Sequence, residues 1–185
     1  MIFQIVSLTL PVLLPGLVLI FALKKNYLKF LDFPLDHHLK INGSRLFGDN
    51  KTYRGLLVFL ISSTIASLVL QGLYLNGYRG FIHPVFKSSP ILIGILYAVA
   101  YAIGELVNSA AKRQMKIAPG AITRSSLKSL QKFMDLSDGI IVVAVMLTFF
   151  TLVTASQALL AAVIGIGLHL GTDKLMQNLD LKKDF

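Results

Sequence analysis

The chain has 185 residues, of which 55% are hydrophobic and only 15% are charged, and its mean hydropathy is +0.70. A soluble domain carries about a quarter of its residues as charges, so this composition favours a polytopic membrane protein. The absence of cysteine excludes disulfides, thiolate nucleophiles and cysteine-ligated metals. The net charge of +9 is expected to orient the protein in a bilayer, and no nucleic-acid partner is expected, because no basic–aromatic run of a known nucleic-acid module is present.

Five apolar segments predict an all-α integral membrane protein with about five transmembrane helices, in a single domain that covers residues 1–185. The segments are residues 1–23, 56–75, 91–111, 139–153 and 155–170. The first has no basic region ahead of it and no small-residue cleavage site, which favours a span over a signal peptide. The last two are short and are separated only by Thr151, Thr154, Ser156 and Gln157. One kinked hairpin is the alternative there, but residues 139–170 are too many for one crossing of about 20 residues.

The charged residues gather on one side of the predicted membrane. With five spans, every basic residue except Arg79 and Lys87 falls in residues 24–54 or 112–132, or after residue 170. All nine acids map to the same side or to its membrane edge. Because basic loops stay in the cytoplasm, we expect an external amino terminus, an internal carboxyl terminus and two structured cytoplasmic loops. The expected location is the cell membrane.

The first cytoplasmic loop contains a glycine-rich, basic stretch at residues 43–55, ahead of the second span. Glycines let backbone amides approach an anion, and Lys51 and Arg54 supply positive charge near Asp49. The spacing of a P-loop is absent. The stretch is a weak phosphate-binding signal, and a basic loop that only sets topology explains it about as well.

The third span ends in polar residues that share one helix face. They are Glu105, Asn108, Ser109 and Lys112, spaced i, i+3, i+4 and i+7. Such groups are costly to expose to lipid, which favours a functional site at this membrane boundary. The alternative is a polar stripe that joins helices, with the Lys112 ammonium extending to the interface.

Two carboxylates, Asp135 and Asp138, lie one turn apart where the fourth span begins. Mg²⁺ takes one or two carboxylates together with substrate phosphates, so this pair is a candidate magnesium site. Helix capping is the alternative for one of the two acids, Asp135. At the end of the fifth span, His169 and Asp173 are spaced i and i+4. We interpret His169 as an interfacial histidine in preference to a member of the site.

These blocks together resemble the CDP-archaeol synthase family, which is related to the phosphatidate cytidylyltransferases. The resemblance extends over about residues 30 to 140. It is carried by Pro34-Leu35-Asp36, by Gly48-Asp49-Asn50-Lys51-Thr52-Tyr53-Arg54-Gly55, and by Gly104-Glu105, Ser109, Lys112-Arg113 and Asp135-Leu136-Ser137-Asp138. The chain has Glu105 where the family tends to have aspartate, and Leu-Ser between the two acids where the family has Gln-Leu.

The resemblance implies a CTP-dependent transfer that converts a membrane lipid phosphate to a CDP-lipid and pyrophosphate. It implies that Asp135, Asp138 and Glu105 hold Mg²⁺, and that Asp135, Asp138 and Lys112 are catalytic. CTP and its phosphates would be bound by Asp49, Lys51, Arg54, Asn108, Ser109 and Arg113. The lipid phosphate is already an anion and would attack the α-phosphorus without a strong base, while its tail enters laterally between spans. The active site would face the cytoplasm.

Two other classes of function remain open in the sequence. A transporter would place ionisable residues in the middle of spans and would show internal symmetry, and neither feature is present. A non-catalytic membrane subunit that binds lipid would not need two acids beside Lys112 and Arg113. The class of lipid and the oligomeric state are not determined by the sequence.

Overall fold

The computed structural model describes residues 1–119, 121 and 128–179 and confirms the all-α prediction. Five helices make up most of the described chain. They are α1 (Ile2–Lys24), α2 (Tyr53–Leu75), α3 (Pro90–Gln114), α4 (Lys128–Phe149) and α5 (Ala155–Asn178). The connections contain two 3₁₀ turns, η1 (Lys29–Leu31) and η2 (Pro84–Lys87), and a small hairpin of β1 (Lys40–Ile41) and β2 (Ser44–Arg45).

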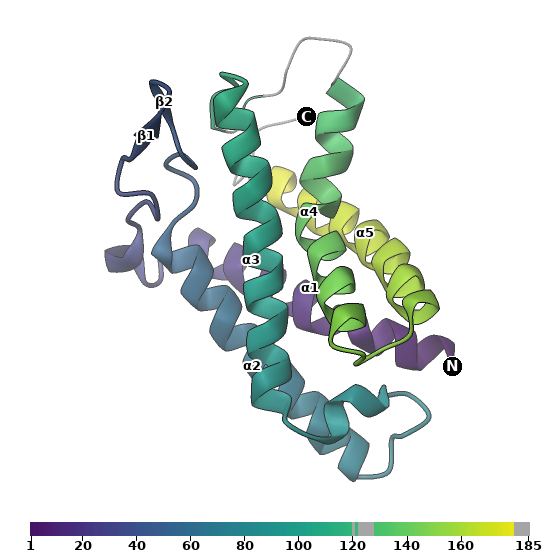
Figure 1. The fold of residues 1–185 in the computed structure, drawn as a ribbon. Coiled ribbons are helices and arrows are strands. Elements are labelled where there is room, and N and C mark those ends of the chain that lie inside the picture. The colour runs from purple at the N-terminus through teal and green to yellow at the C-terminus, as the bar shows by residue number, and fades with distance from the viewer. Residues whose placement is uncertain (120, 122–127, 180–185) are drawn as a thin grey trace.

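Helix α3 lies in the middle of the bundle, between α2 and α4, while α5 packs against both α1 and α4 (Figure 1). The hairpin, the end of α3 and the start of α4 lie at one end of the bundle. The α2–α3 connection and the turn between α4 and α5 lie at the other. We call the first of these the basic end, formed by residues 25–52, 112–119 and 128–138. The folded chain thus brings together the two loops that the charge pattern placed on one side.

Four helices, α1, α2, α3 and α5, are long and apolar enough to cross a membrane. Helix α4 differs because it begins at Lys128, about three turns before the predicted start of the fourth span. Its first turns carry the charged side chains of Lys128, Lys132, Asp135 and Asp138. The predicted limits of this span, residues 139–153, are therefore wrong at both ends, since the helix stops at Phe149. Because the first half of α4 is charged and its apolar second half is short, the hydropathy pattern predicts a loop followed by a short span.

The turn at residues 150–154 separates α4 from α5, so the last two predicted spans belong to two separate helices. Thr151 has a positive φ of 54°, which reverses the chain direction. Thr154 then caps α5 in a capping box, in which its hydroxyl accepts from the Gln157 amide and the Gln157 side chain accepts from the Thr154 amide. Of the polar residues between the two predicted spans, Thr151 and Thr154 lie in the turn, whereas Ser156 and Gln157 lie in the first turn of α5.

Helix α1 contains two prolines, and the bundle compensates for one of them. Because Pro15 has no N–H, the carbonyl of Pro11 lacks its helical donor. The buried hydroxyl of Ser63 on α2 donates to this oxygen at 2.6 Å. One turn earlier, the Tyr97 hydroxyl of α3 donates to the Leu8 carbonyl at 2.9 Å. These bonds fix α1 against both neighbours.

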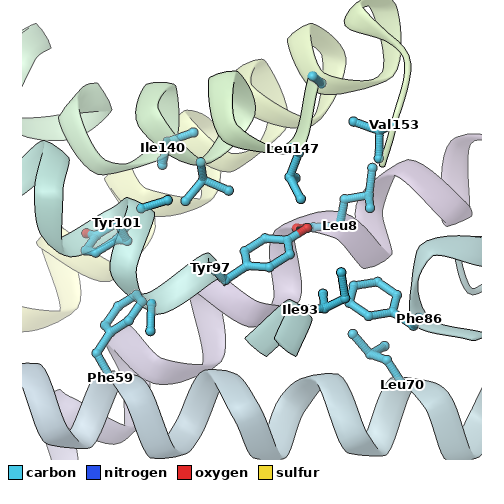
Figure 2. Packing of buried hydrophobic residues seen from close by; sticks show 14 of the residues in the cluster. Leu8, Phe59, Leu70, Phe86, Ile93, Tyr97, Tyr101, Ile140, Leu147 and Val153 are labelled. Atoms are coloured by element: carbon cyan, nitrogen blue, oxygen red, sulfur yellow. The ribbon is translucent and has the colours of Figure 1, made fainter. Parts of the chain in front are cut away.

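Small residues let α3 approach its neighbours closely. A Cβ atom at Gly104 would overlap the backbone of Asp138, so α3 and α4 touch at the first turns of the predicted fourth span. Figure 2 shows Tyr101 one turn away, between Phe59 of α2 and Ile140 of α4. The Phe59 and Tyr101 rings stack with centroids 4.3 Å apart. This packing places Asp138 beside the polar face of α3.

Candidate functional site

The first loop is organised around one buried carboxylate, Asp36. Its Oδ2 accepts from Arg45 Nε at 3.2 Å and from the amides of Phe47 and Gly48 at 3.0 Å each. Its Oδ1 accepts from Arg45 Nη2 at 2.6 Å and from the His38 amide at 3.2 Å. Burial alone would raise the pKa of Asp36, but these donors outweigh it and hold the pKa well below its usual range. The carboxylate therefore folds residues 36–48 around itself.

The two ends of this loop are joined, which sets the direction of Lys51. The Leu35 amide donates to the Lys51 carbonyl at 2.8 Å, and the Tyr53 amide donates to Phe33 at 3.1 Å. Thr52 caps α2, because its hydroxyl accepts from the Gly55 amide at 3.3 Å. Lys51 thus comes directly before the first turn of α2 and faces α3.

Lys51 forms an ion pair with Glu105 of α3, at 2.7 Å between Nζ and Oε2. Burial by itself would lower the pKa of Lys51, but the charge of Glu105 and its hydrogen bond outweigh burial and raise the pKa. The Tyr101 hydroxyl, one turn earlier on α3, also interacts with the Glu105 carboxylate. Lys51 and Glu105, which were predicted as site residues from separate segments, are therefore paired, and Tyr101 interacts with Glu105.

The two acids of α4 meet the polar face of α3 one turn further on. Asn108 Nδ2 donates to Asp135 Oδ1 and to Asp138 Oδ2, each at 2.7 Å. Lys112 Nζ donates to the same Asp135 oxygen at 2.7 Å. Asp138 Oδ1 accepts from the Gly139 amide at 2.6 Å. One amide and one ammonium thus serve two carboxylates in a site that is largely shielded from solvent.

The donor set of this pair fits a hard cation. Asp135 and Asp138 each present an oxygen to the same nitrogen atom, so both can contact one small ion in that position. Mg²⁺ needs only one or two carboxylates when substrate phosphates complete its shell. Glu105 is instead paired with Lys51. Within residues 1–119, 121 and 128–179, no three acidic or histidine side chains form a metal-binding group on their own.

Two buried guanidinium groups have unused donors, one at the start of α2 and one at the basic end of α3. Arg54 Nη2 pairs with Asp32 at 2.9 Å, but its Nε and Nη1 are buried and find no acceptor among the described residues. Arg113 is only 5% exposed, and its Nε and Nη1 are likewise buried and unpartnered in the described part of the chain. Buried donors without acceptors cost free energy, so a bound anion would stabilise both. Both arginines were predicted to bind phosphate.

Two further residues that were predicted to bind the nucleotide, Ser109 and Asp49, lie in different surroundings. Ser109 is buried, 4% exposed, on the same helix as Asn108. The Asp49 side chain is 69% exposed and pairs with Arg45 Nη1 at 2.8 Å. Asp49 therefore belongs to the surface of the Asp36 loop.

Sequence reasoning gave Tyr101, Asp36 and Arg45 no role in the site. Tyr101 had one usable signal, since it lies four residues before Glu105 and so shares its helix face. His169 was interpreted as an interfacial residue, and its Nδ1 lies 2.9 Å from the Leu136 carbonyl of α4. This contact brings α5 to the acid pair.

An apolar cleft between α1, α4 and α5 ends near these polar groups. Its walls are mainly aliphatic, and among them are Leu8, Val12, Ile140, Leu147, Ala158 and Ala162. Tyr101, His169 and Thr172 also line it and supply its polar atoms near the basic end. Because Tyr101 interacts with Glu105, the cleft and the polar site share a wall.

Comparisons with known proteins show the family of this chain. The family model described as CarS-like, CDP-archaeol synthase, matches residues 2–185. A CDP-archaeol synthase of Pyrococcus furiosus is 34% identical over 79 residues, which is 43% of this chain and 43% of that protein. That alignment spans less than half of the relative's length. No solved structure gives a significant match. Because the family model covers nearly the whole chain, the protein belongs to the CDP-archaeol synthase family.

Proposed function

We propose that this protein transfers the cytidylyl group of CTP to a membrane lipid phosphate, giving a CDP-lipid and pyrophosphate. The observation that carries the proposal is the acid pair of α4, which shares Asn108 and lies near the unused donors of the buried Arg113 and near an apolar cleft. Such a site offers places for a cation, for several phosphates and for a lipid tail. Family membership points to the same reaction class.

Asp135 and Asp138 would hold Mg²⁺, and the hydrogen bonds that Asn108 and Lys112 donate to these two carboxylates would then break. The cation supplies charge neutralisation at the triphosphate, as in other phosphoryl-group transfers. Glu105 is the third candidate ligand, and it becomes available only where Lys51 leaves it. Lys51 can leave Glu105 by turning to a phosphate oxygen, because an ammonium pairs with a phosphate as it does with a carboxylate.

The basic residues would bind the triphosphate. Arg54 and Arg113 present unused donors, and guanidinium donors suit phosphate oxygens. Lys112 would move from Asp135 to the leaving pyrophosphate, while Asn108 and Ser109 position the nucleotide. A lipid phosphate oxygen forms the new bond to the α-phosphorus. The bond from the α-phosphorus to the bridging oxygen breaks, and pyrophosphate leaves with that electron pair, so no proton is transferred.

The cleft between α1, α4 and α5 would receive the lipid tail from the side of the bundle. Its aliphatic walls match an acyl or isoprenoid chain, and its polar end adjoins Glu105. The soluble nucleotide would enter from the basic end, which we propose faces the cytoplasm because it holds most of the basic residues. The two substrates thus approach the acid pair from the bilayer and from water.

Turnover of labelled CTP tests this proposal. Purified protein in detergent with Mg²⁺ would be given phosphatidic acid or an ether-linked isoprenoid glycerol phosphate, in parallel. We expect a labelled CDP-lipid from at least one of them and an equal amount of pyrophosphate. Absence of labelled lipid with both substrates, in protein that remains folded, would refute the proposed activity.

A further inference from the structure

We propose that His169 of α5 binds the phosphate group of the lipid substrate, through its Nε2 atom. This inference rests on the proposed function, because it assigns the lipid tail to the cleft between α1, α4 and α5. It concerns a side chain that the transfer described above does not use.

The ring of His169 has one nitrogen committed to the protein. Nδ1 lies 2.9 Å from the Leu136 carbonyl oxygen, and since a carbonyl can only accept, Nδ1 carries a hydrogen. Nε2 lies 4.0 Å from Asp173 Oδ1, which is too far for a hydrogen bond. Nε2 is therefore the ring atom that can meet a ligand.

The position of His169 suits a headgroup. Its side chain lines the cleft together with Tyr101 and Thr172, while the remaining wall is mainly aliphatic. Of the described residues that line the cleft, His169 is the only one with a basic side chain. It also interacts electrostatically with Glu105, so it lies next to the polar site. A lipid with its tail in the cleft would bring its phosphate to this end.

Hydrogen bonding between Nε2 and a lipid phosphate does not depend on which group holds the proton. Nε2 carries a hydrogen in the imidazolium form and a lone pair in the neutral form, and a phosphate monoester carries one hydrogen in its monoanion. One proton between Nε2 and a phosphate oxygen satisfies either charge state. Lys51 neutralises Glu105 nearby, which lowers the repulsion that the arriving phosphate meets.

A purely structural role for His169 is the competing explanation, because the Nδ1 bond ties α5 to α4. Two substitutions separate the roles. His169→Asn keeps an amide near the position of Nδ1 and removes Nε2, while His169→Gln keeps an amide near the position of Nε2 and removes the Nδ1 bond. Binding through Nε2 requires the asparagine variant to be the weaker of the two, and a structural clamp requires the reverse order.

The experiment measures the KM for the lipid phosphate and the KM for CTP in both variants, with thermal stability as a check on folding. We expect His169→Asn to raise the KM for lipid about tenfold, as for loss of one hydrogen bond to a charged group, with little change in the KM for CTP. His169→Gln should stay within about threefold of wild type. His83→Gln is the matched control, because His83 is a buried histidine at the other end of the bundle, and it should not alter lipid use.

A second measurement keeps the inference separate from the proposed activity. Equilibrium binding of each lipid phosphate would be compared with binding of the same lipid without its phosphate, in wild type and in both variants. We expect wild type to prefer the phosphorylated lipid and His169→Asn to lose that preference. An unchanged preference in His169→Asn, or a weaker His169→Gln, would overturn the inference even if turnover is observed. Absence of turnover in wild type that still prefers the phosphorylated lipid would refute only the proposed activity.

Discussion

Buried carboxylates occur in two places at the basic end, and their surroundings differ. Asp36 has a fully buried side chain and accepts five hydrogen bonds, all from residues 38–48 of its own loop. Asp135 and Asp138 instead share the Asn108 amide, which comes from another helix, and Lys112 serves only Asp135. A carboxylate saturated by its own segment has no capacity for a ligand. Carboxylates that share their donors can exchange them for a cation, so the first group stabilises the loop and the second is suited to chemistry.

The largest expected effect is that of Asp138→Asn on turnover. The substitution removes one charge from the acid pair without changing the size of the side chain, so we expect cytidylyl transfer to fall by at least about 10³-fold. Thermal stability in detergent should remain close to that of wild type, since Asn108 can still bond to the amide oxygen. Wild-type turnover in this variant would show that the pair is a structural feature like Asp36.

Asp36→Asn should show the opposite pattern. It leaves the partly buried Arg45 guanidinium with only the exposed Asp49 as an anionic partner, and loss of a hydrogen bond to a charged group costs about 1.5–3 kcal/mol. We therefore expect a large drop in the free energy of unfolding, with turnover per folded molecule reduced much less than in Asp138→Asn. Denaturation followed by intrinsic fluorescence measures the first quantity, and active-site titration with CTP normalises the second.

The same contrast has a pH dependence. The folded pKa of Asp36 is below its unfolded value of about 3.9, so its bonds stabilise fully above that pH. This stabilisation is lost as the pH falls from about 4 through the folded pKa. Wild type should therefore lose stability in acid more steeply than Asp36→Asn, and the two proteins should converge. Parallel melting curves at about pH 7 and about pH 3 measure this, and a constant difference would contradict the role of Asp36.

Arg113→Met should stabilise the ligand-free protein and weaken nucleotide binding. The substitution removes two buried donors that have no acceptor among the described residues, which we expect to raise the free energy of unfolding by about 1–3 kcal/mol. If Arg113 binds a phosphate, the Kd for CTP should rise about tenfold. Arg79→Met at the other end of the bundle is the control for nucleotide binding, and it should leave the Kd for CTP unchanged.

The smallest expected effect is that of Asp49→Asn. The pair with Arg45 is solvent-exposed on the Asp49 side, so its loss should cost less than about 1 kcal/mol. Turnover should be unchanged, because Asp49 lies on the loop surface. A tenfold loss of activity would restore Asp49 to the nucleotide site, where the family resemblance had placed it.

Most of the fold could be predicted because hydropathy alone identifies long apolar helices. Helix α4 was mislocated because its charged first half, from Lys128 to Asp138, has no hydropathy signal of its own. In the site, helical spacing predicted that Glu105, Asn108 and Lys112 share a face. It could not show that Glu105 pairs with Lys51 while the other two meet α4, because partners depend on how helices pack. The roles of Asp36 and His169 depend on such contacts too.

Calorimetric titration of the purified protein with CTP, with and without Mg²⁺, tests the central claim most directly. If the acid pair is a magnesium–nucleotide site, CTP binding should depend on Mg²⁺ in wild type and in Asp36→Asn. In Asp138→Asn, CTP binding should no longer depend on Mg²⁺. Equal CTP binding with and without Mg²⁺ in wild type, or Mg²⁺-dependent binding that persists in Asp138→Asn, would contradict it.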